Sequence, residues 1–219
     1  MTRAIVITGT DTGIGKTVFA AGLSGALDGY YWKPVQAGTE DGTDSDTVAR
    51  LSGLPSERIL PEAYRLTTPA SPHLAARLDG VEIDPERLVL PDVDGPLIVE
   101  GAGGALVPLT ETLLFADMMA RWQAPVIVCA RTGLGTINHS LMTVEALRAR
   151  NVSIAGIVFI GDPHEENERI VPMLAGVRSL GRLPVLERMD AAMLGQAMRE
   201  NIDLSILDGR HSGRTNDND

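Results

Sequence analysis

The sequence predicts an α/β fold with a mostly parallel central sheet and helices on both faces. Short apolar runs alternate with longer segments of helical periodicity along the 219 residues, which is typical of strands joined by crossover helices. A hydrophobic content of 44% can supply the core of such a sheet. The length suits a single domain, expected over residues 1–209, and the polar residues 210–219 are expected to form a disordered tail.

The expected elements follow one another in a regular order. A strand at Arg3–Thr8 leads through a glycine-rich turn into a helix at Lys16–Asp28, whose apolar residues share one side. Residues 53–95 are rich in proline and are expected to form an insertion packed on the sheet. The other expected strands are Tyr30–Val35, Pro96–Glu100, Ala124–Ala130 and Ser153–Ile160, and the other expected helices are Ser71–Leu78, Asp84–Leu90, Leu113–Trp122, Thr136–Arg150 and Glu165–Val177.

Charge and composition disfavour several classes of function. The formal net charge is −10, whereas proteins that bind nucleic acid or anionic membranes are usually basic. No apolar run approaches the roughly 20 residues that span a membrane, and the N-terminal run is too short for a secretory leader. Cys129, the single cysteine, lies in an apolar run and is expected to be buried rather than nucleophilic. We therefore expect a cytoplasmic protein without nucleic-acid or membrane partners.

The segment VITGTDTGIGKT, Val6–Thr17, has the context of a phosphate-binding loop. A predicted buried strand precedes it and an amphipathic helix follows it, which distinguishes such a loop from a chance match. It departs from the pattern G-x-x-x-x-G-K-[ST], because Thr10 stands where the first glycine is expected and Gly9 lies one residue earlier. The sequence therefore predicts a P-loop NTPase-like domain with a changed loop.

The residue types in this loop suit a nucleotide and its metal. Gly13 and Gly15 allow successive backbone N–H groups to point toward phosphate oxygens, and the start of the following helix adds unpaired donors. Lys16 would reach the β- and γ-phosphates, and the Thr17 hydroxyl would ligate Mg²⁺. A tight glycine turn without a ligand is the simpler alternative, and the flanking strand and helix disfavour it.

Glu100 is the best candidate for a carboxylate that holds the metal. It ends the apolar run GPLIVE and would lie at the carboxyl edge of the sheet, where ligands bind in open α/β folds. A charge directly after an apolar strand is costly unless it is paired or bound to a metal. The glycines that follow, including Gly101 and Gly103, would allow a ligand to approach the backbone.

A second acidic group lies in EDGTDSDTVARLSG. Its simplest interpretation is a solvated acidic loop with a helix N-cap at Asp44 or Ser45, and spacing alone does not single out Asp46. Lys33, in YYWKPV, could be a solvated residue at a strand end. It could also face the phosphates and neutralise charge on a transferred phosphoryl group.

Several motifs occur together in a characteristic order. They are GTDTGIGKT, KPVQAG, SDTVARL, ASPH, VEGAGGALVPL, FADM and GLGTINHSLMTVEAL. Together they closely resemble the dethiobiotin synthetase family, over about residues 4–160 and more weakly to about residue 207. The combination is specific, whereas the phosphate loop alone is not.

The resemblance implies a homodimer that uses ATP, Mg²⁺, carbon dioxide and 7,8-diaminopelargonic acid. One amine of the diamine captures carbon dioxide as a carbamate, which attacks the γ-phosphate to give a mixed anhydride. The second amine then closes the ureido ring and expels phosphate. Since carbamate and phosphate are both anionic, positioning and charge neutralisation should dominate catalysis.

The resemblance also implies a role for particular residues of this sequence. The catalytic residues would be Lys33, Lys16 and Thr12, and the metal ligands would be Thr17, Asp46 and Glu100. The substrate would contact Thr12, Lys33, Ala37, Ser71 and Asn138, the last across the dimer interface. The nucleotide would contact Gly13, Ile14, Gly15, Lys16, Thr17, Val18, Asp46, Glu100, Gly101, Ala102, Gly103, Leu183, Pro184 and Val185.

Three positions depart from the family pattern. Gly13 stands where an acidic residue is common, and Ala37 stands where a hydroxyl residue is common, so the corresponding contacts are in doubt. Ile160 occupies the position of an asparagine that reads adenine. Base recognition is therefore expected to use backbone groups, including those of Leu183–Val185, and to be looser than usual.

Two other functions are weaker interpretations of the same loop. Partition and septum-positioning ATPases carry a signature lysine early in a similar loop, where this chain has Asp11. Amidating enzymes of the cobyrinic acid type normally add a glutaminase domain with a nucleophilic cysteine, for which this chain has no room.

Overall fold

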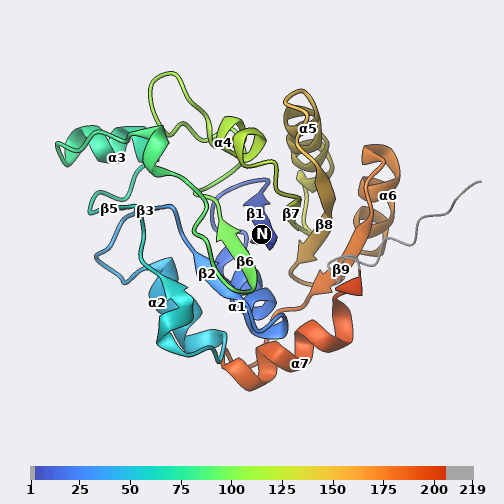
Figure 1. Cartoon of the computed structure of the whole chain (residues 1–219). Helices are drawn as coiled ribbons and strands as arrows, with labels where there is room; N and C mark the ends of the chain where they lie inside the picture. Colours follow the sequence, from blue (N-terminus) through green and yellow to red (C-terminus); the bar gives the residue numbers. More distant parts are fainter. Residues whose placement is uncertain (1–2, 206–219) are drawn as a thin grey trace, which may run out of the picture.

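The computed structural model describes residues 3–205, so the predicted tail at 210–219 lies outside the described residues. Its centre is a seven-stranded parallel sheet in the order β4-β2-β6-β1-β7-β8-β9 (Figure 1). The expected α/β fold with a parallel sheet is confirmed. The strands of this sheet are β1 Arg3–Gly9, β2 Tyr30–Trp32, β4 Ile59–Leu60, β6 Pro96–Glu100, β7 Val126–Arg131, β8 Ile154–Ile160 and β9 Ser179–Leu183.

Helices cover both faces of the sheet (Figure 1). One buried cluster joins α1, α2 and α7 to one face, and a second joins α4, α5 and α6 to the other. In β6, Ile98 belongs to the first cluster and Val99 to the second, as expected for a strand buried on both faces. The helices are α1 Lys16–Ala26, α2 Asp44–Leu51, α4 Phe115–Trp122, α5 Thr136–Arg148, α6 Glu165–Ala175 and α7 Ala191–Asn201.

The position of β1 within the sheet determines where a ligand can bind. β1 lies between β6 and β7, and its residues Ile5–Ile7 are at most 1% exposed. Because all these strands run parallel, the segments after β1, β2 and β6 leave the sheet at the same edge. The phosphate loop, Lys33 and Glu100 are thereby brought together from distant parts of the sequence.

The strand expected at Tyr30–Val35 is two strands in the structure. β2 ends at Trp32, and β3 (Val35–Ala37) pairs with β5 (Tyr64–Leu66) in a separate two-stranded sheet. Pro34 separates them, because proline has no N–H to donate to a ladder and is disfavoured inside a central strand. Lys33 therefore lies at a break between two sheets and not within a continuous strand.

The proline-rich insertion packs on the sheet as expected. It supplies β4 at one edge of the central sheet, β5 of the small sheet, and α3 (Pro72–Leu78). The helix expected at Asp84–Leu90 is wrong, because only a 3₁₀ turn at Pro85–Arg87 forms there. Pro85 begins that turn and Leu88 leaves the helical region, so the segment is too short for an α-helix.

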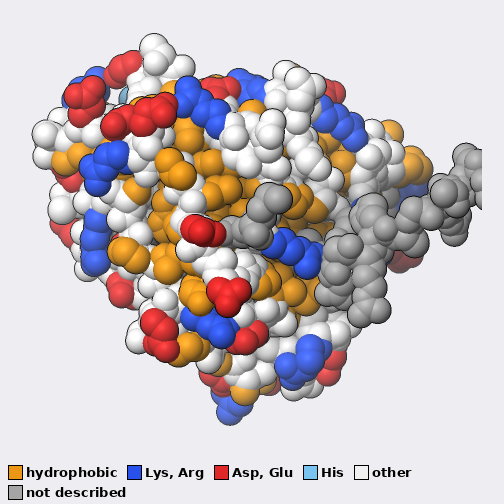
Figure 2. All heavy atoms as spheres, in the orientation of Figure 1, with side chains coloured by type: hydrophobic (Ala, Val, Ile, Leu, Met, Phe, Trp, Pro, Cys, Tyr) orange, Lys and Arg blue, Asp and Glu red, His pale blue; other side chains and the backbone are white. Residues whose placement is uncertain are grey.

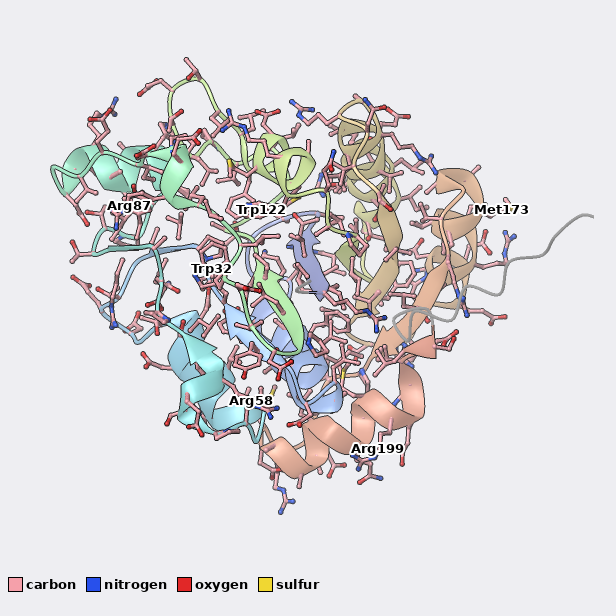
Figure 3. All side chains as sticks on the ribbon, in the orientation of Figure 1. Trp32, Arg58, Arg87, Trp122, Met173 and Arg199 are labelled. Carbon is pink, nitrogen blue, oxygen red and sulfur yellow. The ribbon has the colours of Figure 1, made fainter. Side chains whose placement is uncertain are left out.

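Two tryptophans connect β2 to the helix layer on the face of the sheet opposite α1. Trp32 and Trp122 of α4 point toward each other in Figure 3, with ring centroids 6.2 Å apart. Each indole N–H donates to a backbone carbonyl, from Trp32 to Pro61 at 3.1 Å and from Trp122 to Leu88 at 2.7 Å. These contacts fix the orientation of β2, so that its alternate residues face α1.

Cys129, the single cysteine of the sequence, is a core residue. Cys129 is fully buried in the described structure, and burial raises the pKa of its thiol, as expected for a packing residue. None of the helices within residues 3–205 is both long and apolar enough to cross a membrane. Figure 2 shows Lys and Arg side chains scattered among Asp and Glu on the viewed face, without one large basic patch.

Candidate active site

Two glycines give the phosphate loop its shape for different reasons. A Cβ atom at Gly9 would lie 2.4 Å from Ile14 Cδ1, so the displaced glycine provides space for the loop to fold over Ile14. Gly15 has a φ of 96° and is the N-cap of α1, with no side-chain cap. The first N–H groups of α1 are therefore available to an anion at this end of the helix.

The Lys16 side chain contacts the backbone of the phosphate loop. Its Nζ donates to the backbone oxygen of Asp11 at 2.8 Å, and its side chain is largely buried. Burial lowers the pKa of Lys16, and the neighbouring charge of Lys33 lowers it further. An anionic phosphate would relieve both effects, because it favours the charged form of the ammonium group.

Glu100 is held by three side chains at the carboxyl end of β6. Its Oε1 accepts a hydrogen bond from Thr17 Oγ1 at 2.8 Å and one from Lys33 Nζ at 3.1 Å. Its Oε2 accepts a hydrogen bond from the Tyr31 hydroxyl at 2.8 Å. The carboxylate is 1% exposed, and these donors offset the cost of burying its charge.

Lys33 is a buried cation in contact with two carboxylates. Its Nζ lies 2.6 Å from Asp44 Oδ2 and 3.1 Å from Glu100 Oε1, and it also donates to the Gly101 carbonyl at 3.1 Å. Burial opposes the charge, but Glu100 and Asp44 outweigh it and raise the pKa of Lys33 above 10.5. Lys33 is therefore a buried cation paired with two carboxylates beside the phosphate loop, and the interpretation as a solvated edge residue is wrong.

Asp44, and not Asp46, faces the phosphate loop. Asp44 Oδ1 accepts from Thr17 Oγ1 at 3.0 Å, and despite desolvation Lys33 lowers the pKa of Asp44. Asp46 is exposed, and its Oδ2 accepts from both the N–H and the hydroxyl of Thr43 at 2.9 and 2.8 Å. Thr43 is the N-cap of α2, so Asp46 completes a capping box. The structure thus places Asp44, and not Asp46, beside Thr17, while the assignment of Asp46 to the metal stays a prediction. The N-cap expected at Asp44 or Ser45 is corrected to Thr43.

This placement predicts different effects for two neighbouring aspartates. We expect Asp44→Asn to lower metal-dependent turnover at least ~10-fold, as is usual when groups around a metal are altered. Asp46→Asn should change turnover little, because its carboxylate serves the cap of α2. Steady-state rates measured over a range of Mg²⁺ concentrations would compare the two. A larger loss of turnover in Asp46→Asn than in Asp44→Asn would indicate that Asp46, and not Asp44, holds the metal.

Three oxygen-bearing side chains converge where a nucleotide-bound Mg²⁺ is expected. Thr17 Oγ1 is within hydrogen-bond distance of both Asp44 Oδ1 and Glu100 Oε1, so the three oxygens lie close together before any metal binds. Hydroxyl and carboxylate oxygens suit Mg²⁺, which usually takes one or two carboxylates besides phosphate and water. The residues present therefore fit the metal that the phosphate loop implies.

A pocket of about 470 Å³ opens beside the phosphate loop. Thr12 lines it from the loop, and Lys33 and Asp44 line it from the ion-pair cluster. The structure thus brings most residues predicted to contact a second substrate to one cavity next to the expected γ-phosphate. Its other lining residues are Val35, Gln36, Ala37, Pro69, Ala70, Ser71, Pro72, Ala102, Gly103 and Val107.

Comparison with known proteins identifies the family. The chain is 66% identical over 197 residues to the ATP-dependent dethiobiotin synthetase BioD of Rhizorhabdus wittichii, covering 90% of this chain and 94% of that protein. The chain belongs to the dethiobiotin synthetase family. The enzymes of the same name from Rhodopseudomonas palustris strain HaA2 and Brucella anthropi are 63% and 58% identical, over 92% and 95% of this chain and 94% and 99% of theirs.

Two broader comparisons agree with the P-loop fold. A family model described as an AAA domain matches residues 3–193. A ParA family ATPase from Chlorobium tepidum superposes with a TM-score of 0.56 over 90% of this chain and 91% of that chain, at 14% identity. This distant likeness concerns the fold, and at Asp11 this chain differs from the signature lysine expected of a partition ATPase.

Asn138 lies away from the substrate pocket of its own chain. It is exposed in the first turn of α5 and lines a separate pocket of about 510 Å³ with Leu134, Ile137 and His164. Leu134 is fully exposed, and α5 begins after Gly135 without a side-chain cap. The structure therefore does not bring Asn138 to the pocket that Thr12 and Lys33 line, and its contact with substrate across a dimer interface stays a prediction.

Ile160 lies on the side of the site expected to receive the base. A Cβ atom at Gly15 would lie 3.0 Å from Ile160 Cγ2, so Ile160 packs against the phosphate loop. Across from it, the carbonyl of Leu183 already accepts from the Gly161 N–H at 3.1 Å. Leu183 is buried, Pro184 is half-buried and Val185 is 70% exposed, so Pro184 and Val185 are the more accessible residues of this segment.

We therefore expect this dethiobiotin synthetase to discriminate weakly between bases. Loss of a hydrogen bond to adenine at Ile160 corresponds to about 1 kcal/mol, so GTP and CTP should reach kcat/KM values within about tenfold of that for ATP. Ile160→Asn should increase the preference for ATP, as measured by the three kcat/KM values in parallel. A strict requirement for ATP in the unaltered chain would show that Ile160 does not loosen base choice.

Sequence reasoning missed three residues of the site. Asp44 was considered only as a helix cap, and Tyr31 and Gln36 were not considered as site residues. Gln36 is nearly buried, and its Oε1 accepts from the Asp44 N–H at 3.1 Å, so it fixes the start of α2. The only sequence signal for Gln36 is its place in the motif KPVQAG, where it immediately precedes Ala37, a residue that departs from the family pattern.

Proposed function

We propose that this chain is an ATP-dependent dethiobiotin synthetase that carboxylates 7,8-diaminopelargonic acid with carbon dioxide and closes its ureido ring. The observation that carries this proposal is the position of the pocket of about 470 Å³, which shares Thr12 and Lys33 with the phosphate site. A substrate in this pocket would have its reacting end beside the γ-phosphate. High identity to dethiobiotin synthetases over almost the whole chain supports the same activity.

The reaction has three steps. One amine adds to carbon dioxide and loses a proton, which gives an anionic carbamate. A carbamate oxygen then attacks the γ-phosphorus of ATP, the bond to ADP breaks, and a carbamic-phosphoric mixed anhydride forms. The second amine attacks the carbamoyl carbon, loses its proton and expels phosphate, which leaves the five-membered ureido ring of dethiobiotin.

The residues of the chain act by positioning and charge neutralisation. Lys16 would turn from the Asp11 carbonyl to the phosphates, and Lys33 would lie between the carbamate and the γ-phosphate. Thr12 would offer its hydroxyl to the amine or the carbamate from the loop. Bound Mg²⁺, held by Thr17, Asp44 and Glu100, would neutralise phosphate charge.

We also propose that the active form is a homodimer. Asn138 and the first turn of α5 lie on an exposed apolar surface with Leu134 and Ile137. A second copy placed there would cover these side chains and let α5 face the far end of the substrate. This arrangement explains why a residue expected to bind substrate lies outside the pocket of its own chain.

Product analysis tests the proposed activity. The purified chain is incubated with the diamine, bicarbonate, Mg²⁺ and ATP, and dethiobiotin is measured by mass spectrometry alongside phosphate release. We expect equal amounts of both products and no dethiobiotin when any one component is omitted. Phosphate release that is the same with and without the diamine would contradict the proposal.

A further inference from the structure

Tyr31 lies on the face of β2 that points toward the phosphate loop. It is fully buried in the cluster beneath α1, whereas its neighbour Trp32 belongs to the cluster on the other face. In the sheet, Tyr31 pairs with Ile98 of β6. Strand residues two apart share a face, so Glu100 lies on the same side of the sheet as Ile98. The Tyr31 hydroxyl therefore reaches the Glu100 carboxylate, two residues along β6 from the residue with which Tyr31 pairs.

The hydroxyl of Tyr31 restrains one oxygen of Glu100. It donates to Oε2 at 2.8 Å, while Oε1 accepts from Thr17 at 2.8 Å and from Lys33 at 3.1 Å. A phenol is protonated at neutral pH, so the Tyr31 hydroxyl is the donor in this hydrogen bond. Each carboxylate oxygen thus has its own partners, and the plane of the group is fixed from both sides.

We propose that Tyr31 is a positioning residue whose hydroxyl fixes the rotation of Glu100, so that Oε1 stays directed at Thr17 and the expected metal. This inference rests on the proposed function, since it concerns the metal-nucleotide site of that enzyme. The carboxylate is buried at the end of a strand, where loss of one donor would leave Oε2 unpaired and free the group to rotate. Trp32, not Tyr31, provides the contacts that anchor β2 to the opposite helix layer.

Nucleotide binding with and without metal tests this role independently of turnover. The affinity of the full chain for ADP is measured by calorimetry in excess Mg²⁺ and again in EDTA. For Tyr31→Phe, we expect affinity in Mg²⁺ to fall about 10-fold, the usual effect of removing a hydrogen bond to a metal-ligating carboxylate. Affinity in EDTA should equal that of the unaltered chain, because the phosphate loop itself is unchanged.

The matched control is Tyr30→Phe, which removes a hydroxyl from the same strand. Tyr30 is partly exposed and packs its ring near Arg58, so this change should leave both affinities unaltered. A second comparison adds Tyr31→Phe to Glu100→Gln, which keeps the size of the side chain and removes its charge. Thermal unfolding shows that each variant is folded at the temperature used, because Glu100→Gln removes one member of the buried ion pair with Lys33. Once Glu100→Gln is present, Tyr31→Phe should cause no further loss of affinity.

The outcomes separate the role of Tyr31 from the proposed function. If the unaltered chain binds ADP with the same affinity in Mg²⁺ and in EDTA, the proposed metal site at Thr17, Asp44 and Glu100 is wrong. If the unaltered chain depends on Mg²⁺ but Tyr31→Phe matches it in both conditions, the positioning role alone is overturned. Equal weakening of Tyr31→Phe in both conditions, or a further loss in the Glu100→Gln background, would also overturn it, because either result indicates a general packing effect.

Discussion

Replacing Lys33 with alanine is expected to lower dethiobiotin turnover at least ~10²-fold, as for other groups that stabilise charge developing in a transition state. Its ammonium lies within 3.1 Å of both Asp44 and Glu100 and borders the substrate pocket. Without it, two carboxylates would face the carbamate and the γ-phosphate without a compensating cation. The loss should therefore appear mainly in kcat, since repulsion grows as the two anions approach.

A second variant separates charge from packing at this position. Lys33→Met keeps an unbranched apolar stem and removes the ammonium group, with its charge and its hydrogen bonds. It should therefore be as inactive as Lys33→Ala if the ammonium group and not the stem is what matters. Thermal unfolding of both variants would be measured, because removing one member of a buried ion pair also destabilises a protein. Near-normal kcat in either folded variant would show that Lys33 does not act on the reacting anions.

The parts of the site that sequence predicted are those with strong local signals. The phosphate loop lies between a buried strand and an amphipathic helix, and Glu100 is a charge at the end of an apolar run. Each of these two signals lies within a single continuous segment of the sequence. The family resemblance then added the order of the motifs, which no single segment contains.

Asp44 shows why a local signal does not determine which acid of a loop lies beside Lys33. Which acid of TDSD faces inward depends on where α2 begins, and a shift of one residue rotates a helix by about 100°. Thr43, which could have been read as a simple turn residue, takes the N-cap and commits Asp46 to the capping box. Its neighbour Asp44 then meets Lys33, which no pattern within the loop indicates.

Tyr31 shows the limit that comes from strand pairing. Its contact with Glu100 spans 69 positions of sequence and requires that β2 lies beside β6. The same limit applies to β9 and α7, which were not expected from periodicity. β9 is short and contains Gly181, and α7 is recognised as part of the fold only through its packing on α1. Such elements depend on neighbours more than on their own propensity.

Lys16→Ala is expected to lower turnover at least ~10²-fold, mainly by weakening the hold on the phosphates. Lys16 donates a hydrogen bond to the Asp11 carbonyl, and burial together with the charge of Lys33 lowers its pKa. Bound phosphate should reverse this shift, because an opposite charge favours the ammonium form. The variant should lose ATP affinity while keeping its affinity for the diamine, whose pocket Lys16 does not line.

The titration of each lysine can be measured directly, because Lys16 and Lys33 are the only lysines in the sequence. A sample labelled with ¹³C at lysine Cε should give two signals, which Lys16→Ala assigns by removing one. Without nucleotide, Lys16 should titrate below 10.5 and Lys33 above it. Since burial disfavours its charge, Lys16 loses its proton first as the pH rises, and MgADP should move that loss to higher pH. If MgADP shifts only the Lys33 signal, then Lys33 contacts the phosphates of the nucleotide and Lys16 does not.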